Sequence, residues 1–209
     1  MFKLEVQNIG KRYRLEWIFK EVNYSFESGS AYAVLGANGT GKSTLLQILG
    51  GSLLPTSGKV NYQLDGQPIE STDAYQYMSI AAPYLELIEE FSLLELVKFQ
   101  LKFKPFIHGL GVSDIIEHLQ LSHAQHKRIA FYSSGMKQRV KMGLAALSAS
   151  PLVLLDEPTA NLDAKACEWY LDLVERFATD KLLIIASNQP SEYQFCRHQL
   201  NITDYSPKL

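Results

Sequence analysis

The chain carries the sequence GANGTGKST at Gly36–Thr44. An apolar run at residues 31–35 precedes it and an apolar-periodic run at residues 45–49 follows, which predicts a strand, a glycine-rich loop and a helix. The loop fits the pattern G-x-x-x-x-G-K-[ST], in which glycines let successive backbone N–H groups point at one polyanion while the helix dipole adds to the attraction. The sequence therefore predicts a site for the phosphates of a nucleoside triphosphate.

Two side chains at the end of this loop have expected roles. Lys42 is expected to reach the β- and γ-phosphates, and the Ser43 hydroxyl is expected to bind Mg²⁺. The other loop residues are candidate nucleotide contacts: Gly36, Ala37, Asn38, Gly39, Thr40, Gly41 and Thr44.

A pair of carboxylates follows the apolar run at residues 152–155. Such a run is typical of a strand buried on both faces, and its C-terminal end is where α/β sheets present ligand groups. There Asp156 is placed to hold Mg²⁺ opposite Ser43, and Glu157 is placed to orient or deprotonate an attacking water. Strand ends also carry solvated acids that have no function, so the phosphate loop is what favours the catalytic interpretation.

Strand signals surround the phosphate loop on both sides. Apolar and polar residues alternate at 2–6 and again at 22–26, which predicts an antiparallel hairpin. Two apolar runs joined by a helix at 164–178 predict parallel strands with a right-handed crossover. The predicted strands cover residues 2–6, 22–26, 31–35, 59–64, 77–82, 152–156 and 182–186.

The region from about residue 84 to 148 interrupts this pattern with helical signals. Ser92 and Glu95 form a capping-box start for a helix at 93–103, and a shorter helix is expected to begin near Ser113. The sequence thus predicts an α/β fold in one domain, residues 1–209. Its core, from residues 1–83 and 149–209, has a mainly parallel sheet and an N-terminal antiparallel β-subdomain, and residues 84–148 form an inserted helical subdomain.

Composition excludes several classes of protein. Twenty Lys and Arg residues against 22 Asp and Glu residues give a net charge of −2, so no nucleic acid is expected as a partner. Cys167 and Cys196 follow no metal or redox spacing and suit a reducing compartment. No signal peptide is evident and no apolar run approaches the length of a membrane span, so any transport role needs another subunit.

Two further motifs have both a functional and an ordinary interpretation. The sequence YSSGMKQR at residues 132–139 opens a predicted helix, where it forms either a simple serine N-cap or a second anion site. One chain that binds one nucleotide does not require two anion sites. If two copies of the chain faced each other, however, both sites could contact the same γ-phosphate. Tyr13, which is flanked by Arg12 and Arg14, is either an exposed loop tyrosine or a ring that stacks on a nucleobase.

The four motifs together resemble those of the ATP-binding-cassette (ABC) ATPases, over nearly the whole chain. GANGTGKST resembles their Walker A motif, LVLLDE their Walker B motif, YSSGMKQR their signature motif, and residues 159–163 their D-loop. Tyr13 lies where the family has an aromatic residue stacked on adenine, which favours the functional interpretation. The resemblance implies a P-loop NTPase core of the RecA-like type, with ATP and Mg²⁺ as cofactors.

The same resemblance implies a head-to-tail dimer of the chain with a second copy of itself or a homologous ATPase subunit. ATP would lie between Gly36–Thr44 of one chain and residues of the other, and ATP binding and hydrolysis would close and open the dimer. The residues contributed in trans would be Ser133, Ser134, Gly135, Met136 and Asp163. A separate transmembrane permease is the implied second partner, which would hold the protein at the cytoplasmic face of a membrane.

The chain departs from the family pattern at three places. In the signature motif, Ser134 and Met136 replace the usual glycine and glutamine, a variation we expect to be tolerated. No glutamine follows the strand at 77–82, where Pro83 stands at or next to the position of the family's Q-loop residue. Asn188 replaces the switch histidine, and its amide can donate a hydrogen bond but cannot carry a proton. We therefore expect slow hydrolysis, with Lys42, Glu157 and Asn188 as the candidate catalytic residues.

The favoured function is an ATP-hydrolysing subunit that powers an ABC transporter. The alternatives are a soluble ABC ATPase acting on nucleic acid or ribosomes, a weakly hydrolysing regulatory clamp, and a small-molecule kinase. A single cassette without a heptad run or basic face argues against the first alternative, and the signature motif argues against the last. Neighbouring genes or a pulldown from solubilised membranes would discriminate between transport and the other functions.

Overall fold

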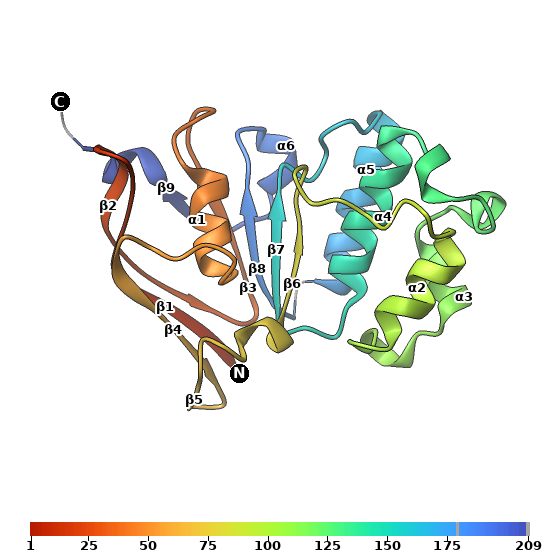
Figure 1. Ribbon diagram of the computed structural model, residues 1–209, viewed down its shortest axis with the longest axis horizontal. Coiled ribbons are helices and arrows are strands. Elements are labelled where there is room, and N and C mark those ends of the chain that lie inside the picture. Colours follow the sequence, from red (N-terminus) through yellow and green to blue (C-terminus); the bar gives the residue numbers. More distant parts are fainter. Residues whose placement is uncertain (179, 208–209) are drawn as a thin grey trace.

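The computed structural model describes residues 1–178 and 180–207. A parallel sheet runs through the middle of the molecule, with an antiparallel sheet on one side and a layer of helices on the other (Figure 1). This arrangement confirms the predicted α/β fold with its antiparallel and helical parts.

Five strands form the parallel sheet in the order β6-β7-β8-β3-β9. Strand β8 lies between β3 and β7, and its Ala186 pairs with Val34 on one side and Asp156 on the other. This register brings the start of the phosphate loop and the predicted metal-binding carboxylate to the same edge of the sheet. The strand bounds are β3 Ser30–Leu35, β6 Met78–Ala81, β7 Leu152–Asp156, β8 Leu182–Ala186 and β9 His198–Asn201.

The antiparallel sheet has the order β2-β1-β4-β5 and contains the predicted N-terminal hairpin. Its strands are longer than the alternating residues indicated: β1 Phe2–Tyr13, β2 Glu16–Glu27, β4 Ser57–Leu64 and β5 Gln67–Ile69. Tyr13 is the last residue of β1 and pairs with Glu16, so the alternative of a tyrosine in a loop between the two strands is wrong. Strands β5 (QPI) and β9 (HQLN) lack an alternation of apolar and polar residues and were not predicted.

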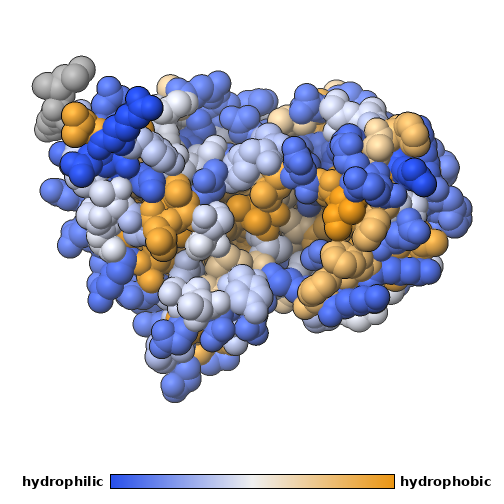
Figure 2. Space-filling model, in the orientation of Figure 1, coloured by the Kyte–Doolittle hydropathy of each residue, from blue (hydrophilic) through white to orange (hydrophobic). Residues whose placement is uncertain are grey.

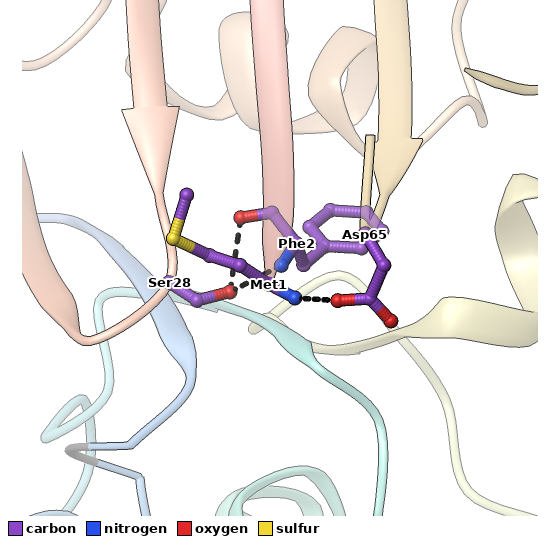
Figure 3. A network of polar contacts seen from close by, with 4 residues as sticks. All are labelled: Met1, Phe2, Ser28 and Asp65. Atoms are coloured by element: carbon purple, nitrogen blue, oxygen red, sulfur yellow. Dashed lines mark hydrogen bonds and ion pairs between the residues drawn. The ribbon is translucent and has the colours of Figure 1, made fainter. Parts of the chain in front are cut away.

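Polar contacts fix the first residues to this sheet (Figure 3). The backbone N–H of Phe2 donates to Ser28 Oγ at 2.8 Å, and the Ser28 hydroxyl donates to the Phe2 carbonyl at 2.9 Å. The amino group of Met1 contacts the carboxylate of Asp65 in the turn between β4 and β5. The start of β1 is thereby joined to both of its neighbouring strands.

The predicted helical region contains three of the six α-helices and, within the described residues, no strand between 84 and 148. The predicted capping box is confirmed, because Ser92 caps α2 and the Glu95 side chain accepts from the Ser92 backbone. The α-helices are α1 Lys42–Leu49, α2 Leu93–Leu101, α3 Val112–His118, α4 Ser134–Leu147, α5 Ala164–Phe177 and α6 Pro190–Tyr193. Short 3₁₀ helices are η1 Ala74–Tyr77, η2 Ile107–Gly109, η3 Ser122–Ala124, η4 Ile129–Phe131 and η5 Ile202–Tyr205.

Both faces of the parallel sheet are buried, each in its own hydrophobic cluster. Leu152 and Leu154 pack with α1 and the antiparallel sheet, whereas Val153 and Leu155 pack with α2 to α5. The helices between residues 84 and 148 therefore extend the core of the sheet. In the described part of the chain, no helix is long and apolar enough to cross a membrane.

Candidate functional site: a nucleotide site in two halves

The phosphate loop turns sharply between β3 and α1, and glycine is required at both of its ends. Gly41 precedes α1 with φ at 103°, and a Cβ atom there would lie 2.5 Å from Ile18 Cγ2. A Cβ on Gly36 would lie 2.5 Å from Thr40 Oγ1 and 2.9 Å from Ile202 Cγ2. Side chains at these positions would push the loop away from the sheet, so the glycines allow its tight path.

Lys42 lies folded back over this loop. Its ammonium donates hydrogen bonds to the carbonyls of Gly36 at 2.8 Å and Ala37 at 3.2 Å, and the residue is only 5% exposed. The first turn of α1 carries no acidic residue that would compete for its backbone N–H groups. The start of α1 thus presents one buried cation and the positive end of a helix, a combination that attracts phosphate.

Asp156 is a buried carboxylate at the end of β7, and it is 1% exposed. Neither of its oxygens has a hydrogen-bond partner among the described residues. Burial raises its pKa from 3.8 to about 6, and the nearby Ser43 side chain opposes the shift without a hydrogen bond of acceptable geometry. Two unpartnered carboxylate oxygens beside a hydroxyl fit a hard divalent cation such as Mg²⁺, which would favour the ionised form.

Glu157 follows directly with an unusual backbone. Its φ of 43° lies in the left-handed region, which side-chain-bearing residues rarely adopt, and its N–H donates to the Ala186 carbonyl at 2.9 Å. Strain of this kind persists only where the surroundings fix it, and it is concentrated at functional sites. Gln138 of α4 supplies part of that support by donating to the Pro158 carbonyl at 3.0 Å.

Asn188, in the loop after β8, is joined to the phosphate loop. Its side-chain amide donates to Asn38 Oδ1 at 2.9 Å, across 150 positions of sequence. The structure therefore brings together the predicted residues of the first half of the site: Gly36–Thr44, Asp156, Glu157 and Asn188. Of these contacts, the Asn38–Asn188 pair has no signal in the sequence.

Tyr13 and Tyr84 are two aromatic residues outside the phosphate loop. Tyr13 is 49% exposed, and Lys11 Nζ lies 5.1 Å from the centre of its ring, so it is an accessible aromatic surface beside a cation. Tyr84 follows the strand where the family's glutamine is missing. Burial raises its pKa, contact with Gln47 of α1 opposes the shift, and the charge of Asp156 adds to it. Tyr84 is thus close enough to Asp156, the predicted metal ligand, for the two side chains to interact electrostatically.

The second half of the site contains the signature and D-loop residues. Ser133 caps α4 by accepting from the Met136 N–H at 3.2 Å, and Asp163 caps α5 by accepting from the Ala166 N–H at 2.8 Å. These two helix starts share a cavity of about 510 Å³, lined by Gln120, Leu121, His123, Ser133, Ser134, Gly135, Met136, Arg139, Asn161, Leu162, Asp163, Lys165 and Ala166. A Cβ on Gly135 would lie 3.1 Å from the Asn161 carbonyl, which shows how closely the two motifs approach.

The two halves are separate places on one chain. No residue of Gly36–Thr44 lines the cavity of the signature motif. Helices α1 and α4 nonetheless begin at the same edge of the molecule, toward which the parallel strands point (Figure 1). Both helix starts therefore face the same direction without forming one pocket.

A family model described as ABC transporter matches residues 19–160 of the chain. The chain belongs to the ABC transporter family. Proteins of this family bind ATP. The predicted membership of the ABC ATPases is confirmed.

Relatives of this ABC protein have sequence identities of about 30%. It is 30% identical over 190 residues to the lantibiotic transport ATP-binding protein SrtF of Streptococcus pyogenes, a match covering 88% of this chain and 79% of SrtF. It is 28% identical over 207 residues to the linearmycin resistance ATP-binding protein LnrL of Bacillus subtilis (strain 168), covering 96% of this chain and 66% of LnrL. The chain thus spans just under two thirds of the length of LnrL.

The fold also matches solved ABC cassettes. The dimeric structure of MJ0796, a bacterial ABC transporter cassette, superposes with a TM-score of 0.79 over 95% of this chain and 93% of that chain, at 23% identity. The match extends over both sheets and the helical layer, as its coverage requires.

Proposed function

We propose that this ABC protein hydrolyses ATP between two facing chains and thereby drives a separate membrane permease from the cytoplasmic side. The separation of the two half-sites on one chain is the observation that carries this proposal. A phosphate held by Lys42 of one chain needs a second chain to meet Ser133 and Gly135, and the MJ0796 cassette is described as a dimer.

The residues of the first half have distinct proposed roles. Backbone N–H groups of Gly36–Thr44 and the ammonium of Lys42 bind the β- and γ-phosphates, while Ser43 and Asp156 would hold Mg²⁺. The metal would supply charge neutralisation on the phosphate oxygens. Glu157 orients the attacking water and accepts its proton, and the Asn188 amide donates a hydrogen bond to the γ-phosphate.

The second half supplies groups in trans. The N-terminus of α4, with Ser133, Ser134, Gly135 and Met136, faces the γ-phosphate held by the other chain, where its dipole and N–H groups stabilise negative charge. Asp163, the last residue of the D-loop, would lie at the same interface between the two chains. Tyr13 stacks on the adenine ring, because it is the accessible aromatic residue at the end of β1.

A groove between the sheet and the helices is the proposed docking site for the permease. It has a volume of about 510 Å³ and is lined by β6, residues 85–88, α2 and α4, with Phe99 38% exposed at its side. Figure 2 shows apolar side chains gathered in the hollow near the middle of this face of the molecule. An amphipathic helix of a permease would bury its apolar face there, with Glu86 available to its polar side. The ammonium groups of Lys104 and Lys141 also line the groove, where they donate to backbone carbonyls of this chain.

Replacing Phe99 with Glu is expected to abolish capture of a polytopic membrane protein, because it places a charge in the apolar groove. The measurement is a pulldown with the tagged protein from detergent-solubilised membranes of its own host. Leu54→Glu is the matched control, since Leu54 is 79% exposed and does not line the groove. Failure of the wild type to capture any membrane protein would contradict the transport role and favour a soluble ATPase or a regulatory clamp.

Asn188→His is expected to raise the turnover of ATP by about 10-fold, because an imidazole can carry the proton or charge that an amide cannot. The measurement is steady-state phosphate release by the purified protein at saturating Mg²⁺-ATP. Asn188→Ala serves as the control and should give no gain, since it removes the hydrogen bond to Asn38 without adding a titratable group. Rapid wild-type hydrolysis with no gain in the histidine variant would disprove a rate-limiting role for this position.

A further inference from the structure

Glu192 is a buried carboxylate that belongs to none of the predicted motifs. It lies in α6, which follows the Asn188 loop, and its exposed fraction is 0%. Burying a carboxylate is costly unless hydrogen bonds or a counter-charge compensate for the lost water. In the described part of the chain, no Lys or Arg forms an ion pair with it.

Hydrogen-bond donors from two different loops compensate for the burial of the Glu192 carboxylate. Its Oε1 accepts from the Thr159 N–H at 2.9 Å and also from the Thr159 hydroxyl, and its Oε2 accepts from the Ser187 hydroxyl. Thr159 is 9% exposed and Ser187 is 0% exposed, so the contacts are shielded from water. Hydrogen bonds to an ionised acceptor in such surroundings are stronger than neutral ones.

The two loops are those that carry the proposed reactive groups. Thr159 stands two positions after Glu157, at the start of the segment that ends at Asp163. Ser187 stands one position before Asn188, and its N–H donates to the Val34 carbonyl of β3 at 3.2 Å. One side chain therefore connects the loop after β7 with the loop after β8.

This connection continues at both ends. On one side Gln138, in the helix of the signature motif, donates to the Pro158 carbonyl at 3.0 Å, next to Thr159. On the other side Asn188 donates to Asn38 of the phosphate loop at 2.9 Å. Hydrogen bonds and two backbone links, from Pro158 to Thr159 and from Ser187 to Asn188, thus connect α4 through Glu192 to the phosphate loop.

We infer that Glu192 is a positioning residue that holds Glu157 and Asn188 in register with each other. This inference rests on the proposed ATP hydrolysis, and Glu192 would act through Thr159 and Ser187. Losing it would free the two loops to move independently, and misplacement of reacting groups by about 1 Å can cost about 100-fold in rate. ATP binding depends on Gly36–Thr44 and would persist.

Glu192→Ala is expected to reduce kcat for ATP hydrolysis by about 10- to 100-fold, with the Kd for a fluorescent ATP analogue changed less than about 3-fold. Glu192→Gln should restore most of the rate, because its Oε1 still accepts from Thr159 and its amide can donate to Ser187 Oγ. Ser191→Ala, an exposed neighbour in α6, is the matched control and should behave as the wild type. Thermal melting of each variant establishes that it is folded.

A double-mutant cycle distinguishes positioning from general destabilisation. In a Thr159→Val background, Glu192→Ala should reduce kcat by a smaller factor than in the wild type, because one of its contacts is already lost. Unchanged kcat in folded Glu192→Ala, or additive effects in the cycle, would overturn the inference while leaving the proposed hydrolysis intact. Absence of turnover in the wild type would overturn both.

Discussion

Glu157→Gln is expected to lower ATP hydrolysis by about 100- to 10,000-fold, because the amide can neither accept the proton of the attacking water nor orient it as a carboxylate does. ATP binding should persist, since Lys42 and the loop are unchanged. The variant is therefore expected to accumulate as an ATP-bound dimer. The measurements are phosphate release and the molar mass from light scattering, with and without Mg²⁺-ATP.

A second substitution tests whether that dimer uses the signature motif. Ser133→Glu in the Glu157→Gln background should leave the protein monomeric with ATP, because it places a negative charge at the helix start proposed to face the γ-phosphate. Thr72→Glu, at an exposed turn, is the matched control and should leave the dimer intact. A dimer that survives Ser133→Glu would refute the head-to-tail arrangement, and normal turnover in Glu157→Gln would refute the assignment of the base.

Asp156→Asn is expected to stabilise the nucleotide-free protein while abolishing Mg²⁺-dependent hydrolysis. The folded-state pKa of Asp156 is raised from 3.8 to about 6, so the ionised carboxylate disfavours folding at neutral pH. At 1.36 kcal/mol for each pKa unit, removing that charge is worth about 3 kcal/mol as an upper estimate. The measurement is the free energy of unfolding in urea at pH 7.5 without nucleotide.

The pH dependence of the Asp156→Asn effect follows from the direction of this shift. Protonated Asp156 is tolerated in the folded state better than the ionised form. Its contribution to the free energy of unfolding of the wild type is therefore full below about pH 4 and is lost as the pH rises through about 6. The stability difference between Asp156→Asn and the wild type should therefore shrink when the pH falls from 7.5 to 5. Asp73→Asn, which removes an exposed carboxyl, is the control and should show no such trend.

Added Mg²⁺-ATP should make the wild type more stable than Asp156→Asn, the reverse of the order expected without nucleotide. The wild type gains binding energy from the metal held by Asp156, whereas the asparagine variant gains only what the phosphate loop provides. Removing Mg²⁺ with EDTA should restore the nucleotide-free order. Equal stabilisation of both proteins by Mg²⁺-ATP would contradict the assignment of Asp156 as a metal ligand.

Several parts of the structure could be predicted because their signals are local. The capping box at Ser92, the all-apolar strand before Asp156 and the glycines around Lys42 each depend on residues within a few positions of one another. Strands β5 (QPI) and β9 (HQLN) gave no comparable signal because neither alternates apolar and polar residues. The end of β1 was misplaced because register shifts in the hairpin break the alternation before Tyr13.

The sequence by itself determined the phosphate loop, the carboxylate pair and the signature motif, since each is a contiguous run with its own backbone requirements. Only the tertiary structure decided how these runs meet. Asn188 reaches Asn38 because β8 lies beside β3. Asp156 is buried at the end of β7 and has no hydrogen-bond partner within residues 1–178 and 180–207. The same packing gives Glu192 its contacts with two loops. Strand order and register set these contacts, and no local pattern encodes them.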